Sequence, residues 1–401
     1  MFVFVCAGCG AELTAPLSQV SLPAHAHQSY GNGTQLPVLM ESGTFAVDPE
    51  PWGPPWRKWE RIDPDEAAVR GVYAPVHALS DGAPGAIVIA PGDIRGVLLL
   101  REKRGGACCG VAGADGPNMV CEACGLLVAT RIDDCSLWQA VWLAPNAVRR
   151  LLVDGADAEP LSWEELTEEG KSTPPFEPIA PWGSPLGASH HWSWSPQWEA
   201  AAGRALAHLL AASEGQPVTV ADGVIEEVFQ SSLDALLPAG PQERRAVLAG
   251  PGRLVPDAGV DILLVPVHPQ TGRTWTPTGP AASAYPVPLP FGVWLWLVSP
   301  QPRLPVPPSG RVPDDVLREP VGRRLSGGSG WRRDFDDLLP PRPHYPFRAD
   351  WGTFHHTLAR LPAVRSPWLR EIFDDLTQPM RTGLFQPTRR RRRCRPVRPR
   401  G

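Results

Sequence analysis

Short apolar runs separated by turn residues dominate the first 150 positions of the chain. Runs of this kind, rich in Val, Ile, Leu and Phe, are typical of β-strands. The pattern predicts a strand from Met1 to Val5, and two strands, Ala86–Ala90 and Gly96–Arg101, joined by a Pro-Gly-Asp turn. Two more strands are expected at Gly125–Thr130 and Leu137–Leu143. The first half of the chain is therefore expected to be mostly β.

Helix signals are fewer in this half and more frequent beyond it. Asp63 followed by Pro64 is an N-cap with proline at the first helical position, and it predicts a short helix ending near Gly71. Ser162 and Glu165 form a capping box, which predicts a second short helix.

Apolar residues at helical spacing predict longer helices from Ser195 to about Ser213 and from Gly223 to Leu237. Strands are expected at Val260–Val267 and Phe291–Val298, and last helices at Asp350–Leu361 and Ser366–Gln378. The fold class predicted for the whole chain is α+β, with a β-rich N-terminal domain and a second α+β domain.

Turn-forming residues divide the chain further. Its 401 residues include 49 prolines and 39 glycines, so we expect many turns, Pro-rich loops and short elements. The expected organisation is a β-rich domain at 1–150, a short helix and linker at 151–189, an α+β domain at 190–300, a Pro-rich segment with short helices at 301–383, and a disordered Arg-rich tail at 384–401.

Charge is distributed unevenly between the body of the chain and its tail. The net charge is -4, but the last fourteen residues, from Thr388, carry eight arginines and no acid. The remainder is therefore acidic, near -12. The tail is a candidate for binding nucleic acid by counterion release, although it holds no aromatic residue to stack on bases.

Targeting signals are not apparent in the sequence. The apolar start, Met1 to Val5, lacks a preceding positive charge and ends at Cys6. No run reaches the roughly 18 apolar residues that a membrane span needs. We therefore expect a cytoplasmic protein, in which paired cysteines are more often metal ligands than disulfides.

Two cysteine pairs are the most informative motif. Cys6 and Cys9 form one CxxC pair, Cys121 and Cys124 form another, and glycine follows each pair directly. Two thiolates on a tight turn can bind one side of a metal ion, and a second such turn completes a tetrahedron, most often around Zn²⁺. The spacing predicts that all four cysteines meet in space, although iron accepts the same ligands.

These turns resemble the knuckles of zinc ribbons and rubredoxin-like sites. The resemblance covers residues 1–12 and 119–130, and it departs from a compact ribbon because about 110 residues separate the two pairs. It implies a closed site with a structural role. The strings VCAGCGAELTAP and VATRIDDCSLWQAVWLAP also resemble uncharacterised actinobacterial proteins, which implies a lineage and a compartment but no activity.

Other ligand sets are compatible with the sequence. Cys108 or Cys109 could join Cys121 and Cys124, with a fourth ligand from elsewhere. Alternatively, Cys6 and Cys9 could bind a separate ion with the two histidines His25 and His27, which are spaced more closely than usual. The cysteines could also be buried thiols without metal.

Three hypotheses for function follow. The first is a non-enzymatic interaction protein, with a Pro/Trp segment from Trp52 to Trp59 as a contact surface for an unknown protein partner. The second is a nucleic-acid-binding protein that uses the tail and the knuckles. The third is a hydrolase of unrecognised type, sited around His268 or His344, since the common catalytic motifs are absent.

Overall fold

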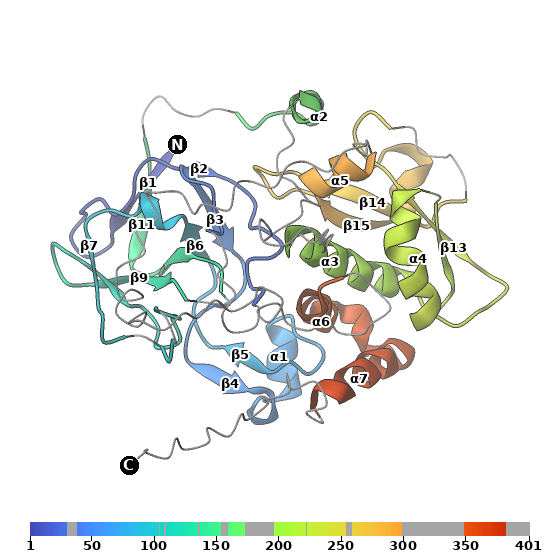
Figure 1. Ribbon diagram of the computed structural model, residues 1–401, viewed down its shortest axis with the longest axis horizontal. Coiled ribbons are helices and arrows are strands. Elements are labelled where there is room, and N and C mark those ends of the chain that lie inside the picture. Colours follow the sequence, from blue (N-terminus) through green and yellow to red (C-terminus); the bar gives the residue numbers. More distant parts are fainter. Residues whose placement is uncertain are drawn as a thin grey trace, which may run out of the picture.

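The computed structural model describes residues 1–29, 38–103, 105–107, 110–134, 137–153, 159–172, 196–221, 223–253, 259–298 and 349–381. Within these ranges the chain forms two halves (Figure 1). The first is built on strands and the second combines a parallel sheet with helices. This arrangement confirms the α+β class. In the described part of the chain, no helix has the length and apolar character needed to cross a membrane.

A seven-stranded sheet forms the centre of the first half. Its strands, in spatial order, are β2 (Ser18–Gln19), β3 (Thr44–Asp48), β6 (Ala86–Ile89), β10 (Ala140–Leu143), β9 (Leu127–Ile132), β8 (Met119–Cys121) and β7 (Val97–Leu99). All pairs are antiparallel except β2 with β3. Apolar side chains cover both faces, so the sheet separates two apolar clusters.

A two-stranded ribbon packs against one face of this sheet. It pairs β1 (Phe2–Cys6) with β11 (Val148–Leu152), in a register that sets Cys6 opposite Val148. Phe4 is 1% exposed and its ring meets that of Phe45 edge-on at 5.0 Å. The ribbon thus brings the start of the chain to the same apolar cluster that contains Cys121.

Smaller elements complete this half. They are β4 (Trp56–Lys58) paired with β5 (Ala78–Ser80), the 3₁₀ helices η1 (Trp59–Arg61) and η2 (Pro91–Asp93), and helix α1 (Pro64–Val69). Asp63 caps α1 by accepting hydrogen bonds from the backbone N–H groups of Asp65 and Glu66, as predicted. The expected turn at Pro91 is present as η2, but β6 and β7 lie at different places in the sheet and do not pair.

The second half contains four parallel strands with helices around them. Their order is sequential: β12 (Val218–Val220), β13 (Arg244–Leu248), β14 (Ile262–Val267) and β15 (Tyr285–Pro290). The 3₁₀ helix η3 (Gly279–Ser283) lies between β14 and β15, and the 3₁₀ helix η6 (Pro362–Arg365) lies between the last two helices. The helices are α2 (Trp163–Ser172), α3 (Pro196–Ser213), α4 (Val224–Leu236), α5 (Phe291–Val298), α6 (Trp351–Arg360) and α7 (Pro367–Arg381). One apolar cluster joins all of these helices to the sheet.

Helix α3 is the central helix of this cluster, and α6 crosses it closely. A Cβ atom at Gly203 would lie 2.5 Å from the carbonyl oxygen of Asp350 and 3.1 Å from the amide nitrogen of Phe354. Glycine is therefore what allows the two backbones to approach. The start of α6 is fixed by Asp350, whose carboxylate accepts a hydrogen bond of 2.6 Å from the N–H of Thr353.

One sequence prediction in this half is wrong. The run Phe291–Val298 is helix α5, and the strand is the preceding segment Tyr285–Pro290, which is rich in proline and for which no strand was predicted. An apolar run of eight residues does not distinguish a buried helix from a buried strand. Strand β15 tolerates its alternating prolines because it is the edge of the sheet, where every second N–H has no partner strand to bond.

Candidate metal centre

The first cysteine knuckle is a tight turn that follows β1. The N–H of Cys6 donates to the carbonyl of Ala11 at 2.8 Å, and the N–H of Gly10 donates back to the carbonyl of Cys6 at 2.9 Å. Gly10 has φ +79°, in the left-handed region that glycine adopts without strain. The N–H of Ala7 bonds to the carbonyl of Ala147 at 2.9 Å, which anchors the turn to the segment before β11.

The second knuckle repeats this hydrogen-bond pattern between β8 and β9. The N–H of Cys121 donates to the carbonyl of Leu126 at 2.8 Å, and the N–H of Gly125 donates to the carbonyl of Cys121 at 2.8 Å. Gly125 has φ +75°. The N–H of Glu122 bonds to the carbonyl of Gly96 at 2.9 Å, the counterpart of the Ala7 contact. The two turns therefore have the same local structure.

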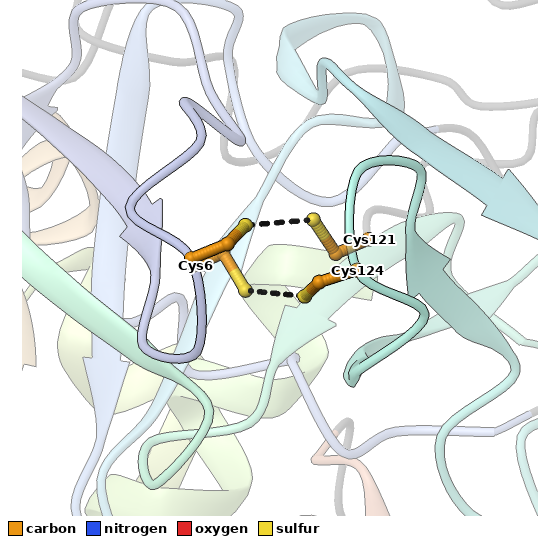
Figure 2. A group of neighbouring side chains, drawn as sticks. Cys6, Cys121 and Cys124 are labelled. Carbon is orange, nitrogen blue, oxygen red and sulfur yellow. Dashed lines mark hydrogen bonds between the residues drawn. The ribbon is translucent and has the colours of Figure 1, made fainter.

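The knuckles face one another with their sulfur atoms inward (Figure 2). The Sγ atoms of Cys6 and Cys124 are 3.5 Å apart, and those of Cys9 and Cys121 are 3.7 Å apart. All four sulfur atoms lie within 4.8 Å of one another. The first cysteine of each turn thus meets the second cysteine of the other, as expected for two equivalent turns around one point.

These separations fit a metal ion better than a disulfide. A tetrahedron with Zn–S bonds of about 2.3 Å has sulfur atoms about 3.8 Å apart, close to both short separations. A disulfide needs about 2.05 Å, and the four cysteines are free. An ion at the centre would require movements of well under an ångström for these two pairs, so the site is preformed.

Burial and hydrogen bonding prepare the sulfur atoms to carry charge. Cys6 and Cys121 are buried, whereas Cys9 and Cys124 are exposed. Burial works to raise the pKa of the Cys6 thiol, but N–H groups of Cys9 and Gly8 donate to its sulfur and help lower the pKa to about 7. The N–H of Leu126 acts in the same direction on Cys124, but hydrogen bonds among the clustered thiols, first with Cys6, raise its pKa to about 12.

Without a cation, a thiolate at Cys6 is stabilised by hydrogen bonds from its neighbours, whereas the thiol of Cys124 keeps its proton. A divalent ion would remove that difference, because its charge favours the thiolate form of every ligand. The donor set, the preformed geometry and the N–H groups directed at sulfur all fit a four-thiolate metal site.

The alternative with histidine ligands does not form. The His25 ring packs on Trp138 at 4.4 Å, and burial lowers its pKa to about 3, so it stays neutral. The Nε2 atom of His27 lies 3.1 Å from a carboxylate oxygen of Asp48. Both tryptophan neighbours of these histidines belong to the apolar cluster on the opposite face of the sheet from the cysteines. Cys108 and Cys109, which carry the remaining alternative, lie outside the described residues.

His268, a catalytic candidate from the sequence, makes hydrogen bonds to the backbone through both ring nitrogens. It is 6% exposed at the end of β14, and its Nε2 is 2.9 Å from the carbonyl oxygen of Leu161. Its Nδ1 accepts hydrogen bonds of 3.2 Å from the N–H groups of Gln270 and Thr271. Both ring nitrogens are therefore used to hold the chain before α2 against this turn. His344 and the Arg-rich tail lie outside the described residues.

A charged cluster between the two halves was not foreseen from the sequence. Glu50, just after β3, accepts from Arg360 at 2.8 Å and lies 3.2 Å from the Nε2 of His356, both on α6. The rings of His27 and His356 stand 6.1 Å apart. Burial works to raise the pKa of Glu50, but His356 and Arg360 lower it to about 2. The cluster is an electrostatic link between the halves.

The Pro/Trp segment, Trp52 to Trp59, exposes fewer tryptophan rings to solvent than a contact surface was expected to offer. Trp52 stacks on Trp142 with ring centroids 4.5 Å apart and planes 9° apart, so it covers the sheet of its own domain. Trp56 is 49% exposed, whereas Trp59 is partly buried against α1.

Comparison with known proteins found no family model that matches the chain, and no match among curated proteins or solved structures.

Proposed function

We propose that Cys6, Cys9, Cys121 and Cys124 bind one structural Zn²⁺, and that the protein is a zinc-stabilised interaction protein rather than an enzyme. The observation that carries the proposal is the convergence of four sulfur atoms from two equivalent turns. Four thiolates fill the coordination sphere of zinc and leave no position for water or substrate, which is typical of structural sites.

The position of the site supports a structural role. One knuckle belongs to the β1–β11 ribbon and the other to the β7–β8–β9 end of the large sheet. A bound ion would therefore join the ribbon to the large sheet directly, in addition to the apolar packing and the hydrogen bonds, such as Arg150 to Gln19, that already connect them. Because the free energy of metal binding adds to the stability of the fold, a bound ion would stabilise a half that consists largely of loops and short strands.

An interaction role agrees with what surrounds the site. Apolar side chains remain exposed on the strands next to it: Leu98 on β7 is 53% exposed, Leu127 on β9 is 37% exposed, and Leu151 on β11 is 48% exposed. His268, the catalytic candidate that lies among the described residues, has both ring nitrogens in hydrogen bonds to the backbone. A binding surface is therefore the better-supported function for this half.

Elemental analysis of the purified protein tests the metal assignment. We expect one zinc per chain, lost in both Cys6→Ser and Cys121→Ser. His25→Ala and Cys394→Ser are matched controls and should keep the full zinc content. Iron in place of zinc would give the visible absorption of an iron–thiolate centre and would overturn the choice of metal. Zinc content that is unchanged in both cysteine variants would refute the site itself.

A further inference from the structure

A groove beside α1 is lined by residues from both halves. It has a volume of about 500 Å³ and is lined by Trp59, Pro64, Val72, Tyr73, Arg365 and Arg370, among others. Its walls are η1 and α1 on one side and the η6–α7 segment on the other. The size falls within the range of about 300–1,000 Å³ that is usual for ligand pockets.

The groove offers two aromatic rings and a proline over an apolar base. Val72 at the base is 2% exposed, and Trp59 packs partly on the small apolar cluster beneath it. Val69, at the end of α1, is 90% exposed, so apolar surface continues beside the groove. Grooves lined with Trp and Tyr are the surfaces that bind proline-rich segments in an extended polyproline conformation.

The charged side chains at the rim of the groove indicate which charge a ligand should carry. The Arg365 guanidinium lies 4.4 Å above the Tyr73 ring, and within the described residues no carboxylate pairs with it. Arg370, in contrast, is paired with Asp374 at 3.0 Å. Asp65 lines the opposite wall and would repel an acidic group there. A bound carboxylate is therefore favoured at the Arg365 end of the groove, and only at that end.

We infer that the groove binds a proline-containing segment of a partner protein, with a carboxylate next to the prolines that pairs with Arg365. This inference deepens the proposed interaction role by naming the chemistry of the partner. Proline rings pack on Trp59 and Tyr73, and the guanidinium, already held over an aromatic ring, forms a charge-assisted hydrogen bond to the carboxylate.

Calorimetric titration with synthetic peptides tests the inference. The probe is an acetylated, amidated peptide of the form PPEPPP, and its PPQPPP analogue removes only the charge. We expect saturable binding of the first and about tenfold weaker binding of the second, with a difference that shrinks as salt is added. Arg365→Glu should weaken binding of the acidic peptide by about tenfold or more and should improve binding of a PPKPPP peptide.

Trp59→Ala should weaken binding of the acidic and neutral peptides alike, because it removes the apolar platform. Trp56→Ala is the matched control, since this neighbouring ring is exposed but does not line the groove. Each variant is checked for native circular dichroism before titration. Binding by Arg365→Glu equal to that of the wild type would overturn the inference, and so would the lack of saturable binding at millimolar peptide.

Self-association offers a third outcome. Dimerisation that Arg365→Glu abolishes, with no peptide binding, would assign the groove to a second copy of this chain and overturn the partner peptide. Zinc content measured on the same preparation separates this test from that of the metal site, because a failed groove with one bound zinc leaves the zinc assignment intact.

Discussion

Removal of the metal is expected to unfold the first half of the protein and spare the second. The perturbation is chelation under reducing conditions, so that the four freed thiols do not oxidise. The knuckles are joined through cysteines 112 and 118 positions apart, and only the folded chain holds them together. Between residues 159 and 381 the sequence contains no cysteine, so the second half has no direct dependence on the ion.

The expected magnitude follows from the geometry. Structural zinc contributes about 10–16 kcal/mol to the folding of zinc-finger peptides near neutral pH. Closing a loop of about 100 residues alone corresponds to about 4.7 kcal/mol in cross-linked proteins. Whole domains have stabilities of about 5–15 kcal/mol. The zinc contribution is thus as large as the stability of an entire domain, and its loss should abolish the fold of this half.

Amide hydrogen exchange, followed by mass spectrometry of peptides, locates the effect. Chelation should remove protection from β1, β8, β9 and β11, while α3, α4 and β14 keep theirs because they belong to the other core. Re-addition of zinc should restore the protection. Equal protection in the first half with and without metal would refute the reasoning, even if zinc is found in the purified protein.

Three further predictions concern single residues. Gly125→Ala places a Cβ in open space but at φ +75°, so urea unfolding should show a loss of about 1–2 kcal/mol with zinc retained. Gly203→Ala should lower the free energy of unfolding by about 1–3 kcal/mol through its clash with Asp350, whereas Gly352→Ala, with only a side-chain atom at 3.4 Å, should not. Glu50→Gln should cost about 1–2 kcal/mol at pH 7, allowing for the partial exposure of the pair. The folded pKa of Glu50 is lowered to about 2 from 4.5, so this difference should be complete above pH 4.5 and shrink as the pH falls toward 2.

The features that the sequence predicted best are those encoded by neighbouring residues. Asp63 and Ser162 cap their helices as expected, since a cap depends only on the next three positions. The helices α3 and α4 follow their apolar spacing. In contrast, the segment of α5 was predicted to be a strand and β15 was not predicted, because tertiary position decided both. Helix α5 is apolar all round, and β15 is acceptable as a strand only at the edge of a sheet.

The convergence of the four cysteines was predictable for a different reason. A CxxC pair supplies half of a coordination sphere, so two pairs require each other however distant they are in sequence. The charged cluster around Glu50 has no such local signature. Glu50, His356 and Arg360 are ordinary residues in the sequence, and only the packing of α6 beside the end of β3 brings them together.

The pairing of β1 with β11 has a consequence for synthesis on the ribosome. Cys6 lies opposite Val148, so the first strand emerges long before its partner exists. At translation rates of about 5–20 residues per second, the wait for this partner is roughly 7–30 s. Throughout that interval two thiols of the nascent chain are open to oxidants and to stray metals. A cell that makes this protein must therefore keep its amino-terminal cysteines reduced until the opposing turn arrives.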